Sequence, residues 1–599
     1  MKFKELSQYL EKLEKTPSRI EITKILAELY DNTSIDETDK ATYLILGYLA
    51  PSYRGIVFNL AERMMVRILA KAYGVKIENA IKLYKQKGDL GEVAVELART
   101  KKLKNKKIPL ESRRFLTGQA KSLSITEVYE RLTKIALEEG EKSQERKINE
   151  MAKLLAELDS LSARYVARIP VGRLRLGFSD KTILDALSWM EMGDKSKSKR
   201  IEEAYVILPD VGILAKNIKG YGIDKAVKNI KPIVGIPVLP MLAQRLKSPN
   251  EMINKMGKVF VEPKFDGLRV LIHYKRDRVR DRDRVEGWVE GVKAYTRNLI
   301  NVVDMFSELK DVGKHVAADE LIIDTEAIGM DPDMKRMVDF QTTMQRRRKY
   351  NIPEKAISIP LRFQVFDIMY KDGENLMSEP YHKRREILKK TIKDTKLLIV
   401  DTAIITEDQE VINREYREKI KTGLEGVMVK KYDTEYIPGR TGWRWVKMKQ
   451  EESAQGKLSD TVDCIVMGYT QGKGKRASFG LGQFLVGIRD NDEVKTVTKV
   501  GTGLTDEQFR KLKKRLKDLE IKEKPKNYIV NKLLEPDFWV MPEVVVEIAA
   551  DEITKSPTHS AGLALRFPRL IKFRDDKSWE EATTLTELKD FFKLQGNKI

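Results

Sequence analysis

The apolar residues of this 599-residue chain change their period once, after the proline-containing stretch from Pro232 to Pro240. Before this stretch they recur at spacings of three and four, as in Met151–Leu161, which is the pattern of amphipathic helices. After it they gather in short runs typical of strands, such as Val259–Val261 and Val427–Val429. We therefore expect an all-helical part followed by parts that contain sheets.

Three domains account for this pattern, and the length is compatible with about three to five. The first, residues 1–231, is expected to be all-α. The second, residues 232–449, is expected to be a mixed α/β domain. A polar segment, Glu451–Asp460, then precedes new short strands, so residues 450–599 are expected to form a small β-barrel-like domain with a C-terminal helix.

The charge of the chain favours a polyanionic partner. Lysine and arginine number 112 against 90 aspartate and glutamate residues, which gives a formal net charge of +22. The sequence has no uninterrupted apolar run of about 18 residues and no signal-peptide pattern. We therefore expect an intracellular protein of the cytoplasm or nucleoid, with no membrane partner.

Cysteine and histidine usage limits the kinds of metal site. Cys464 is the only cysteine, which excludes an internal disulfide and a cysteine-based metal cluster. His273, His315, His382 and His559 show no paired ligand spacing, so a histidine-bound zinc site is not expected. Carboxylate oxygens should hold any metal.

The most informative segment is Val261–Arg269, a charged loop between two apolar strands with the pattern K-x-D-G-x-R. One interpretation is an Asp-Gly turn of a hairpin that leaves Lys264 in water. The other makes Lys264 a nucleophile, because burial or neighbouring cations disfavour the charge of a lysine and leave an attacking amine near neutral pH. Attack on phosphorus would form a phosphoramidate.

This segment resembles motif I of the covalent nucleotidyltransferases, the superfamily of polynucleotide ligases and mRNA capping enzymes. Segments similar to motifs Ia, III, IIIa, IV, V and VI follow in the family's order: Ala294–Asn298, Asp324–Ala327, Phe366–Tyr370, Glu425–Lys430, Trp445–Lys449 and Leu565–Lys577. The last segment ends in R-x-D-K, as in ATP-dependent DNA ligases. With its helical N-terminal third, the whole chain is similar to DNA ligases of the archaeal and eukaryotic replicative type.

The resemblance implies a fold and a reaction. It implies an all-α DNA-binding domain, an α/β (α+β) nucleotidyltransferase domain that is adenylated, and a C-terminal β-barrel OB-fold. Lys264 would attack the α-phosphorus of ATP and keep AMP as a covalent intermediate. The AMP would pass to the 5′-phosphate of a nick in duplex DNA, and the 3′-hydroxyl would then seal the strand, in replication, repair and recombination.

The resemblance also implies residue roles. Phe366 would stack on adenine and Glu262 would lie at the base edge, although a phenylalanine in an apolar strand is also an ordinary core residue. Glu326 and Glu425 would bind Mg²⁺, which Mn²⁺ could replace; alternatively, Glu326 is the solvated end of a strand. The residues assigned to the nucleotide are Glu262, Asp266, Arg269, Arg297, Glu326, Phe366, Lys430, Lys447, Lys449, Arg574 and Lys577.

Two of these assignments carry geometric expectations. Lys447 and Lys449, two residues apart on one predicted strand, should project to the same face. Arg574 and Lys577 are far from Lys264 in sequence, so the C-terminal domain would have to close over the nucleotide like a lid for them to reach its phosphates.

The expected partner is nicked double-stranded DNA. By resemblance, Phe340 and Phe567 would press into the minor groove beside the nick. The basic clusters Lys101–Lys107 and Arg346–Lys349, which include Arg346 and Arg348, would bind phosphates without regard to sequence, although each can also be a solvated surface. We expect a monomer. Docking on a sliding clamp is an expectation of kinship alone, because no clean copy of a clamp-binding motif is present.

Two other functions compete with this interpretation. An RNA ligase or an mRNA capping enzyme would share motif I and much of motif V, but the R-x-D-K ending and the helical N-terminal third favour the DNA enzyme. A non-catalytic DNA-binding protein would explain the charge but would give Lys264, Glu326, Glu425 and Lys449 no role. After Lys449 the sequence Gln450–Ser453 departs from the family's usual Asp-Tyr. The sequence leaves open whether the enzyme requires ATP or also uses ADP or another nucleotide.

Overall fold

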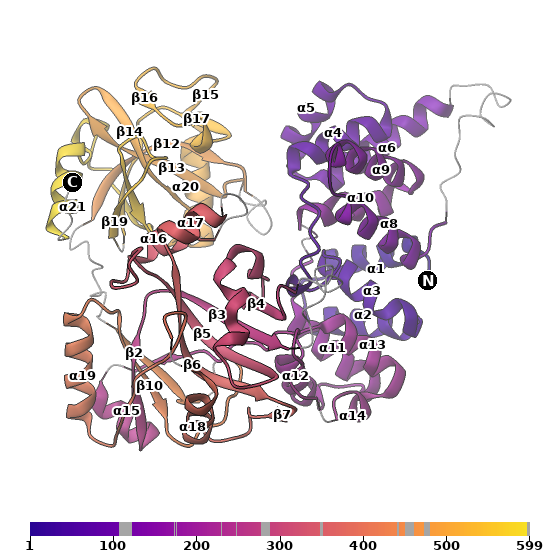
Figure 1. Ribbon diagram of the computed structural model, residues 1–599. Helices are drawn as coiled ribbons and strands as arrows, with labels where there is room; N and C mark the ends of the chain where they lie inside the picture. The colour runs from indigo at the N-terminus through magenta and orange to yellow at the C-terminus, as the bar shows by residue number, and fades with distance from the viewer. Residues whose placement is uncertain are drawn as a thin grey trace. The chain divides into compact units, whose positions relative to one another are not determined.

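The structure is a computed structural model that describes residues 1–106, 122–172, 174, 176–228, 230–246, 248–276, 288–347, 352–393, 395–439, 442–449, 461–472, 480–550 and 552–595. The chain divides into two compact units, Met1–Gln450 and Glu451–Ile599. Figure 1 shows the helices and strands of both units. Within the described ranges, no helix combines the length and the apolar character needed to cross a lipid bilayer.

The N-terminal part of the first unit is helical, as its sequence period predicts. In α8 (Ile125–Leu137), Ser124 accepts from the backbone N–H of Glu127, whose carboxylate accepts from the backbone N–H of Ser124. The buried side of this helix carries apolar residues at spacings of three and four. Further helices are α1 (Phe3–Lys15), α2 (Arg19–Asn32), α3 (Ile35–Leu46), α4 (Glu62–Tyr73), α5 (Ile77–Lys87), α6 (Leu90–Lys106), α9 (Ser143–Glu157), α10 (Ser160–Arg168), α11 (Asp180–Met192), α12 (Ser198–Ile207), α13 (Val211–Tyr221) and α14 (Ile223–Ala226).

The rest of the first unit is built on two sheets. The first has the order β1-β11-β10-β2-β9, and its strands are β1 (Gln244–Arg245), β2 (Val259–Lys264), β9 (Ile404–Thr406), β10 (Gly426–Lys431) and β11 (Trp445–Lys449). The second has the order β4-β3-β5-β6-β7, with β8 paired to β6, and its strands are β3 (Leu268–Lys275), β4 (Val292–Thr296), β5 (Glu320–Gly329), β6 (Leu361–Lys371), β7 (Glu374–Asn375) and β8 (Leu398–Val400).

Alternation along the strands gives the first sheet one face that packs on helices and another that carries charged residues. Val261 of β2 and Val429 of β10 belong to a buried cluster with apolar side chains of α15 (Pro249–Met256) and α19 (Gln409–Lys421). Successive side chains of a strand point to opposite faces, so Glu262 and Lys264 lie on the other face. The remaining helices of this part include α16 (Phe340–Met344), α17 (Ile352–Ser358) and α18 (Tyr381–Thr391).

The second unit is rich in strands, as predicted. The central strand β12 (Val462–Thr470) pairs with β13 (Gln483–Asp490) and with both β17 (Phe538–Val540) and β18 (Val545–Ala549). Other strands are β14 (Glu493–Val500), β15 (Glu520–Ile521), β16 (Tyr528–Ile529), β19 (Glu552–Lys555), β20 (Leu563–Arg566) and β21 (Arg569–Phe573), with helices α20 (Asp506–Asp518) and α21 (Leu585–Leu594). Cys464 is buried in the core of this unit. The predicted sequence of helical, mixed and strand-rich regions is thus confirmed.

Candidate active site

The register of three strands brings the predicted residues together in rows. In β2, β10 and β11, the residues directly opposite one another are Lys264, Gly426 and Lys449 in one row. The next row on the same face is Glu262, Met428 and Lys447, and the third is Phe260, Lys430 and Trp445. Lys447 and Lys449 therefore share a face, as predicted from their spacing.

Gly426 is required where the row with Lys264 crosses β10. Its φ of +147° is rare for residues with a side chain, and a Cβ there would lie 2.2 Å from the carbonyl oxygen of Met448. Any other residue would push β11 away from β10. The Glu-Gly pair of the sequence pattern thus places Glu425 at the start of a strand that can approach its neighbour closely.

A cavity of about 170 Å³ lies over this face, between the first sheet and residues of the second. Predicted residues that line it are Glu262, Lys264, Arg269, Arg297, Glu326, Phe366, Lys430 and Lys447. Asp266 is exposed on the loop between β2 and β3. The predicted residues that the cavity gathers are up to 185 positions apart in the sequence, as Glu262 and Lys447 are.

The ammonium group of Lys264 is held by the carboxylate of Glu425, to which it donates. Lys449 lies 3.4 Å from the other oxygen of the same carboxylate. Burial raises the pKa of Glu425, but the ammonium groups of Lys264 and Lys449 outweigh it and lower the pKa below its ordinary value. Burial and the same two ammonium groups lower the pKa of Lys447.

Arg269 is fixed by a bidentate ion pair. Its Nε donates to Oδ1 of Asp324 at 2.9 Å and its Nη2 donates to Oδ2 at 2.5 Å. Nη1 donates to the carbonyl oxygen of Met241 at 2.6 Å, and the Tyr436 hydroxyl donates to Asp324 at 2.9 Å. The guanidinium also lies 5.5 Å from the ring centroid of Phe366. Its plane therefore has little freedom.

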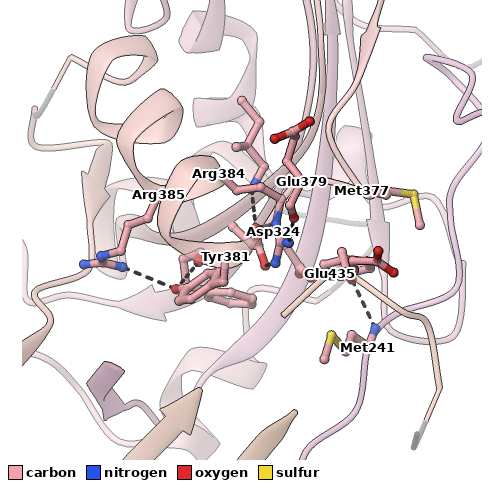
Figure 2. Close-up of polar contacts among 12 residues, drawn as sticks. Met241, Asp324, Met377, Glu379, Tyr381, Arg384, Arg385 and Glu435 are labelled. Atoms are coloured by element: carbon pink, nitrogen blue, oxygen red, sulfur yellow. Dashed lines mark hydrogen bonds and ion pairs between the residues drawn. The ribbon is translucent and has the colours of Figure 1, made fainter. Parts of the chain in front are cut away.

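Glu262 lies at the back of the cavity in a buried polar network. Its Oε2 is 2.6 Å from Nζ of Lys430, and both side chains are 1% exposed. Its Oε1 accepts from Nη1 of Arg385 at 3.0 Å and from the hydroxyl of Tyr381. Arg385 also donates to the Tyr381 hydroxyl at 3.4 Å (Figure 2). Both residues belong to α18, and both contact the Glu262 carboxylate. Such a network is stable only while every member keeps its partner.

The aromatic wall is formed by Phe366 and Trp445, whose ring centroids are 5.9 Å apart in an edge-to-face arrangement. Nζ of Lys430 lies 4.7 Å from the Phe366 centroid and 4.5 Å from that of Trp445. Phe366 is only partly buried, so it is both a wall of the cavity and part of the adjoining apolar cluster. Its two interpretations from sequence are therefore compatible.

Glu326 faces Arg269 across the β3–β5 pairing, in the position directly opposite. Burial raises its pKa to about 7, although the charges of Lys264 and Arg269 act in the other direction. The carboxylates of Asp324 and Asp266 add to the rise. Glu326 therefore titrates near neutral pH, unlike an ordinary surface glutamate.

The carboxylates suit a hard cation with few protein ligands. Within the described ranges, no group of three or more histidine, cysteine, aspartate or glutamate side chains forms a metal-binding cluster. Glu326 and Glu425 nevertheless offer carboxylate oxygens near Lys264, which donates to Glu425 and whose charge acts on Glu326. Mg²⁺ commonly binds one or two carboxylates and completes its shell with water and phosphate oxygens, so this donor set fits it.

Arg574 and Lys577 lie in the second unit and bind a shared acid. Arg574 is 2.9 Å from Asp463 and 2.8 Å from Asp576, and Lys577 is 2.7 Å from Asp463. All three pairs are partly exposed to solvent. The R-x-D-K motif therefore forms one charge cluster with Asp463, a residue of β12 that the sequence motif does not contain.

The two phenylalanines assigned to DNA lie on different units. Phe567, between β20 and β21, is 59% exposed and has a φ of +51°, which is uncommon for a bulky residue. Arg566 lies over its ring at 5.2 Å. Phe340 begins α16, where Asp339 caps the helix by accepting from Thr342.

Arg346 does not lie where the sequence predicts. Its side chain is 1% exposed, donates to Glu308 at 2.7 Å and donates to the carbonyl oxygen of Ile359 at 2.7 Å. An enclosed and neutralised guanidinium does not face DNA phosphates, so this placement contradicts the predicted phosphate contact. Arg348 and Lys107 lie outside the described residues, as do the side chains of Lys101–Lys106.

Several residues of the site were missed from the sequence. Asp324 stands two positions before Glu326 on the same strand, a spacing that places both side chains on one face and could have signalled it. Tyr381 and Arg385 are four apart on α18, a helical spacing that many core helices also show. Asp401, which also lines the cavity, follows the short strand β8 and carries no pattern of its own.

Comparison with known proteins agrees with these observations. Three family models match the chain: DNA ligase N terminus at residues 2–188, ATP dependent DNA ligase domain at 240–449 and ATP dependent DNA ligase C terminal region at 477–577. A probable DNA ligase of Dictyoglomus turgidum is 39% identical over 99% of this chain and 98% of its own length. The DNA ligase of Saccharolobus solfataricus is 37% identical over 100% of this chain and 98% of its own.

A solved structure described as "Pmar-Lig_PreS3" has the same fold, with a TM-score of 0.53, 18% identity and coverage of 95% of this chain and 99% of its own. The full-length relatives and the three family models agree with the motifs, the fold and the cavity around Lys264. The chain belongs to the ATP-dependent DNA ligases, a family whose general function is to seal nicks in DNA through adenylate intermediates.

Proposed function

We propose that Lys264 is the residue that receives AMP from ATP. Its Nζ would form a bond to the α-phosphorus while the bond from that phosphorus to the bridging oxygen breaks, and pyrophosphate would leave with the electron pair. The amine loses a proton as the phosphoramidate forms. The observation that carries this proposal is the placement of Lys264 beside Glu425 and in the wall of the cavity.

The nucleophile has to leave Glu425 in order to attack. Lys449 already contacts the other oxygen of that carboxylate, so Glu425 can keep a cationic partner when Lys264 turns toward phosphorus. Lys447, which lies in the adjacent row, can meet the charge of the α-phosphate. Such transfers depend on positioning and on neutralising charge more than on proton traffic.

The nucleotide would lie with its base toward the back of the cavity. Phe366 offers a ring for stacking on adenine. The edge of the base would lie near Glu262 and Lys430, at the buried end of the cavity. Arg269, fixed by Asp324, would contact the sugar or phosphates, as would Arg297 and the nearby Asp266. The ion pair that fixes Arg269 reduces the entropy lost when ATP binds.

Glu326 and Glu425 would hold Mg²⁺ or Mn²⁺. A bound divalent cation supplies charge that stabilises the transferring phosphoryl group. Glu326 must release its proton to bind it, and its raised pKa makes this step sensitive to pH near neutrality.

For the later steps, the partner would be nicked duplex DNA. Arg574 and Lys577 would exchange Asp463 for the β- and γ-phosphates of ATP when the second unit closes, and would be released afterwards. Phe340 and Phe567 would then contact the minor groove beside the nick. The full-length similarity to DNA ligases supports a DNA substrate. We further propose an intracellular monomer that can dock on a sliding clamp.

Incubation with α-labelled ATP and Mg²⁺, followed by denaturing electrophoresis, tests the proposal. The wild type should carry a stable labelled band that is absent from Lys264→Ala and Lys264→Arg, because neither variant has a primary amine at this position. Lys231→Ala is a matched control, since Lys231 is an exposed lysine outside the cavity, and its band should remain. A wild type without label, or a label that persists in Lys264→Ala, would overturn the proposal.

A further inference from the structure

Asp401 is a buried acid in the wall of the same cavity. It follows β8, and its backbone N–H donates to the carbonyl oxygen of Val365 at 3.0 Å, which extends the parallel pairing of β8 with β6. Arg385 donates to its backbone carbonyl oxygen. The residue is 5% exposed and lines the cavity together with Phe366 and Glu262.

The carboxyl group of Asp401 differs from that of Glu262 in its partners. Among the described residues, Oδ1 of Asp401 is buried and has no hydrogen-bond partner. Both oxygens of Glu262 are occupied by Lys430, Arg385 and Tyr381. A buried polar atom without a partner is costly, and because Asp401 lines the cavity, a ligand bound there is a partner that its carboxyl group can gain. Of these two carboxyl groups, the one with an unpaired oxygen is therefore that of Asp401. Nε1 of Trp445, which also lines the cavity, is likewise buried without a partner in the described part of the chain, but an indole N–H can only donate and cannot accept from an amino group as well.

The protonation of Asp401 defines which ligand groups it can bind. Burial, with the neighbouring charge of Glu262, raises its pKa well above the ordinary value, although Lys430 and Arg385 act in the other direction. A neutral carboxyl group presents one O–H donor beside one carbonyl acceptor. An ionised carboxylate would present two acceptors and would repel an acceptor atom of the ligand.

We propose that Asp401 reads the Watson–Crick edge of adenine, donating its O–H to N1 and accepting from the N6 amino group. N1 is an acceptor beside a donor, and the neutral carboxyl group is the matching donor and acceptor pair. Asp401 is thus a specificity-determining residue at the base, beside a Glu262 that is already engaged. This inference rests on the proposed adenylation of Lys264.

A cycle of protein and nucleotide changes tests the contact. The half-saturating nucleotide concentration for adenylation of Lys264 is measured with ATP and with 1-deaza-ATP, which lacks N1, for wild type and Asp401→Ala. Loss of the hydrogen bond to N1 should raise it about 5- to 20-fold for wild type with 1-deaza-ATP. Asp401→Ala with ATP loses the bonds to N1 and to the N6 amino group, so its rise should be at least as large. For Asp401→Ala, replacing ATP by 1-deaza-ATP should raise the half-saturating concentration by less than about twofold, because this variant has already lost the contact with N1.

Two further variants separate this contact from a change in folding. Asp401→Asn keeps a donor and an acceptor in nearly the same shape, so its half-saturating ATP concentration should stay within about threefold of wild type. Glu407→Gln makes the same carboxyl-to-amide change on an exposed residue of the following segment and should change nothing. Thermal unfolding of each variant verifies that it is folded.

The outcomes distinguish the two proposals. If wild type is not labelled by ATP, the proposed function is overturned, and the inference about Asp401, which rests on it, is overturned as well. If wild type is labelled but the losses from Asp401→Ala and from 1-deaza-ATP multiply, the adenylation proposal stands and the inference about Asp401 is overturned. The same holds if Asp401→Ala binds both nucleotides as wild type does.

Discussion

Two charge clusters of the molecule use the same residue types under different solvent exposure. In the cavity of the first unit, Glu262 and Lys430 are each 1% exposed and Arg385 completes the network. On the second unit, Arg574, Lys577 and Asp463 form an ion-pair cluster that water reaches. A buried pair is fixed because separating it exposes bare charge to a low-dielectric interior, whereas a surface pair can exchange partners at little cost. The first arrangement suits a permanent binding wall and the second suits a contact that must move.

The largest effect is expected from removing the acid of the buried cluster. Glu262→Ala leaves the ammonium of Lys430 and the guanidinium of Arg385 buried without their shared partner. We expect the free energy of unfolding of the first unit to fall by about 3–5 kcal/mol. Urea denaturation without nucleotide measures this loss.

Glu407→Gln, on the surface, is the control for this variant and should change the free energy by less than about 0.5 kcal/mol. If Glu262→Ala does not fold, Glu262→Gln, which keeps an acceptor oxygen, gives a smaller loss that can be measured. A loss from Glu262→Ala no larger than that of the control would mean that the network is not a stabilising one.

The next effect concerns geometry at constant charge. Arg269→Lys keeps a cation beside Asp324 but loses the two parallel hydrogen bonds that fix the guanidinium plane. We expect the rate of Lys264 adenylation at low ATP to fall about 10- to 100-fold. Arg276→Lys is the control, since Arg276 follows the last residue of β3, pairs with Asp319 at the surface and should tolerate the change. Equal rates for the two variants would refute a positioning role for the bidentate pair.

Glu326 gives a pH-dependent prediction. Its folded-state pKa of about 7 exceeds the ordinary value of 4.5, so the native protein holds the proton more tightly than the unfolded chain. The stabilisation from Glu326 is therefore complete below about pH 4.5 and is lost as pH rises through 7. Relative to wild type, Glu326→Gln should gain about 1–3 kcal/mol between pH 4.5 and 8. Urea midpoints across this range measure the gain, and a constant difference between the two proteins would show that Glu326 titrates normally.

Sequence reasoning predicted the parts of the site that follow from local pattern. A spacing of two on a strand placed Lys447 and Lys449 on one face, and the switch from helical to strand period placed the sheets. The motifs then identified most residues that line the cavity.

The partners of those residues could not be predicted, because local period carries no information about which distant elements pack together. Tyr381 and Arg385 reach Glu262 from 119 and 123 positions away. In the sequence, Asp401 looks like the polar end of a short strand and Arg346 like one arginine of a surface cluster, although both are buried in the structure. Because the burial of a charged residue depends on such tertiary contacts, the sequence could not predict that Arg346 is enclosed.

The smallest effect is expected at the surface cluster. Asp463→Asn removes the acid that Arg574 and Lys577 share, but water can solvate both cations. We expect the thermal midpoint of the second unit to fall by about 2 °C or less, and we expect the difference to vanish in about 0.5 M salt, where exposed charges are screened. Calorimetry at low and high salt measures both, with Asp490→Asn, which pairs with Lys495 on the same unit, as the control. A fall of about 6 °C or more that persists in salt would place this cluster with the buried one, and Arg574 and Lys577 could then not exchange Asp463 for phosphate at the low cost that a moving contact requires.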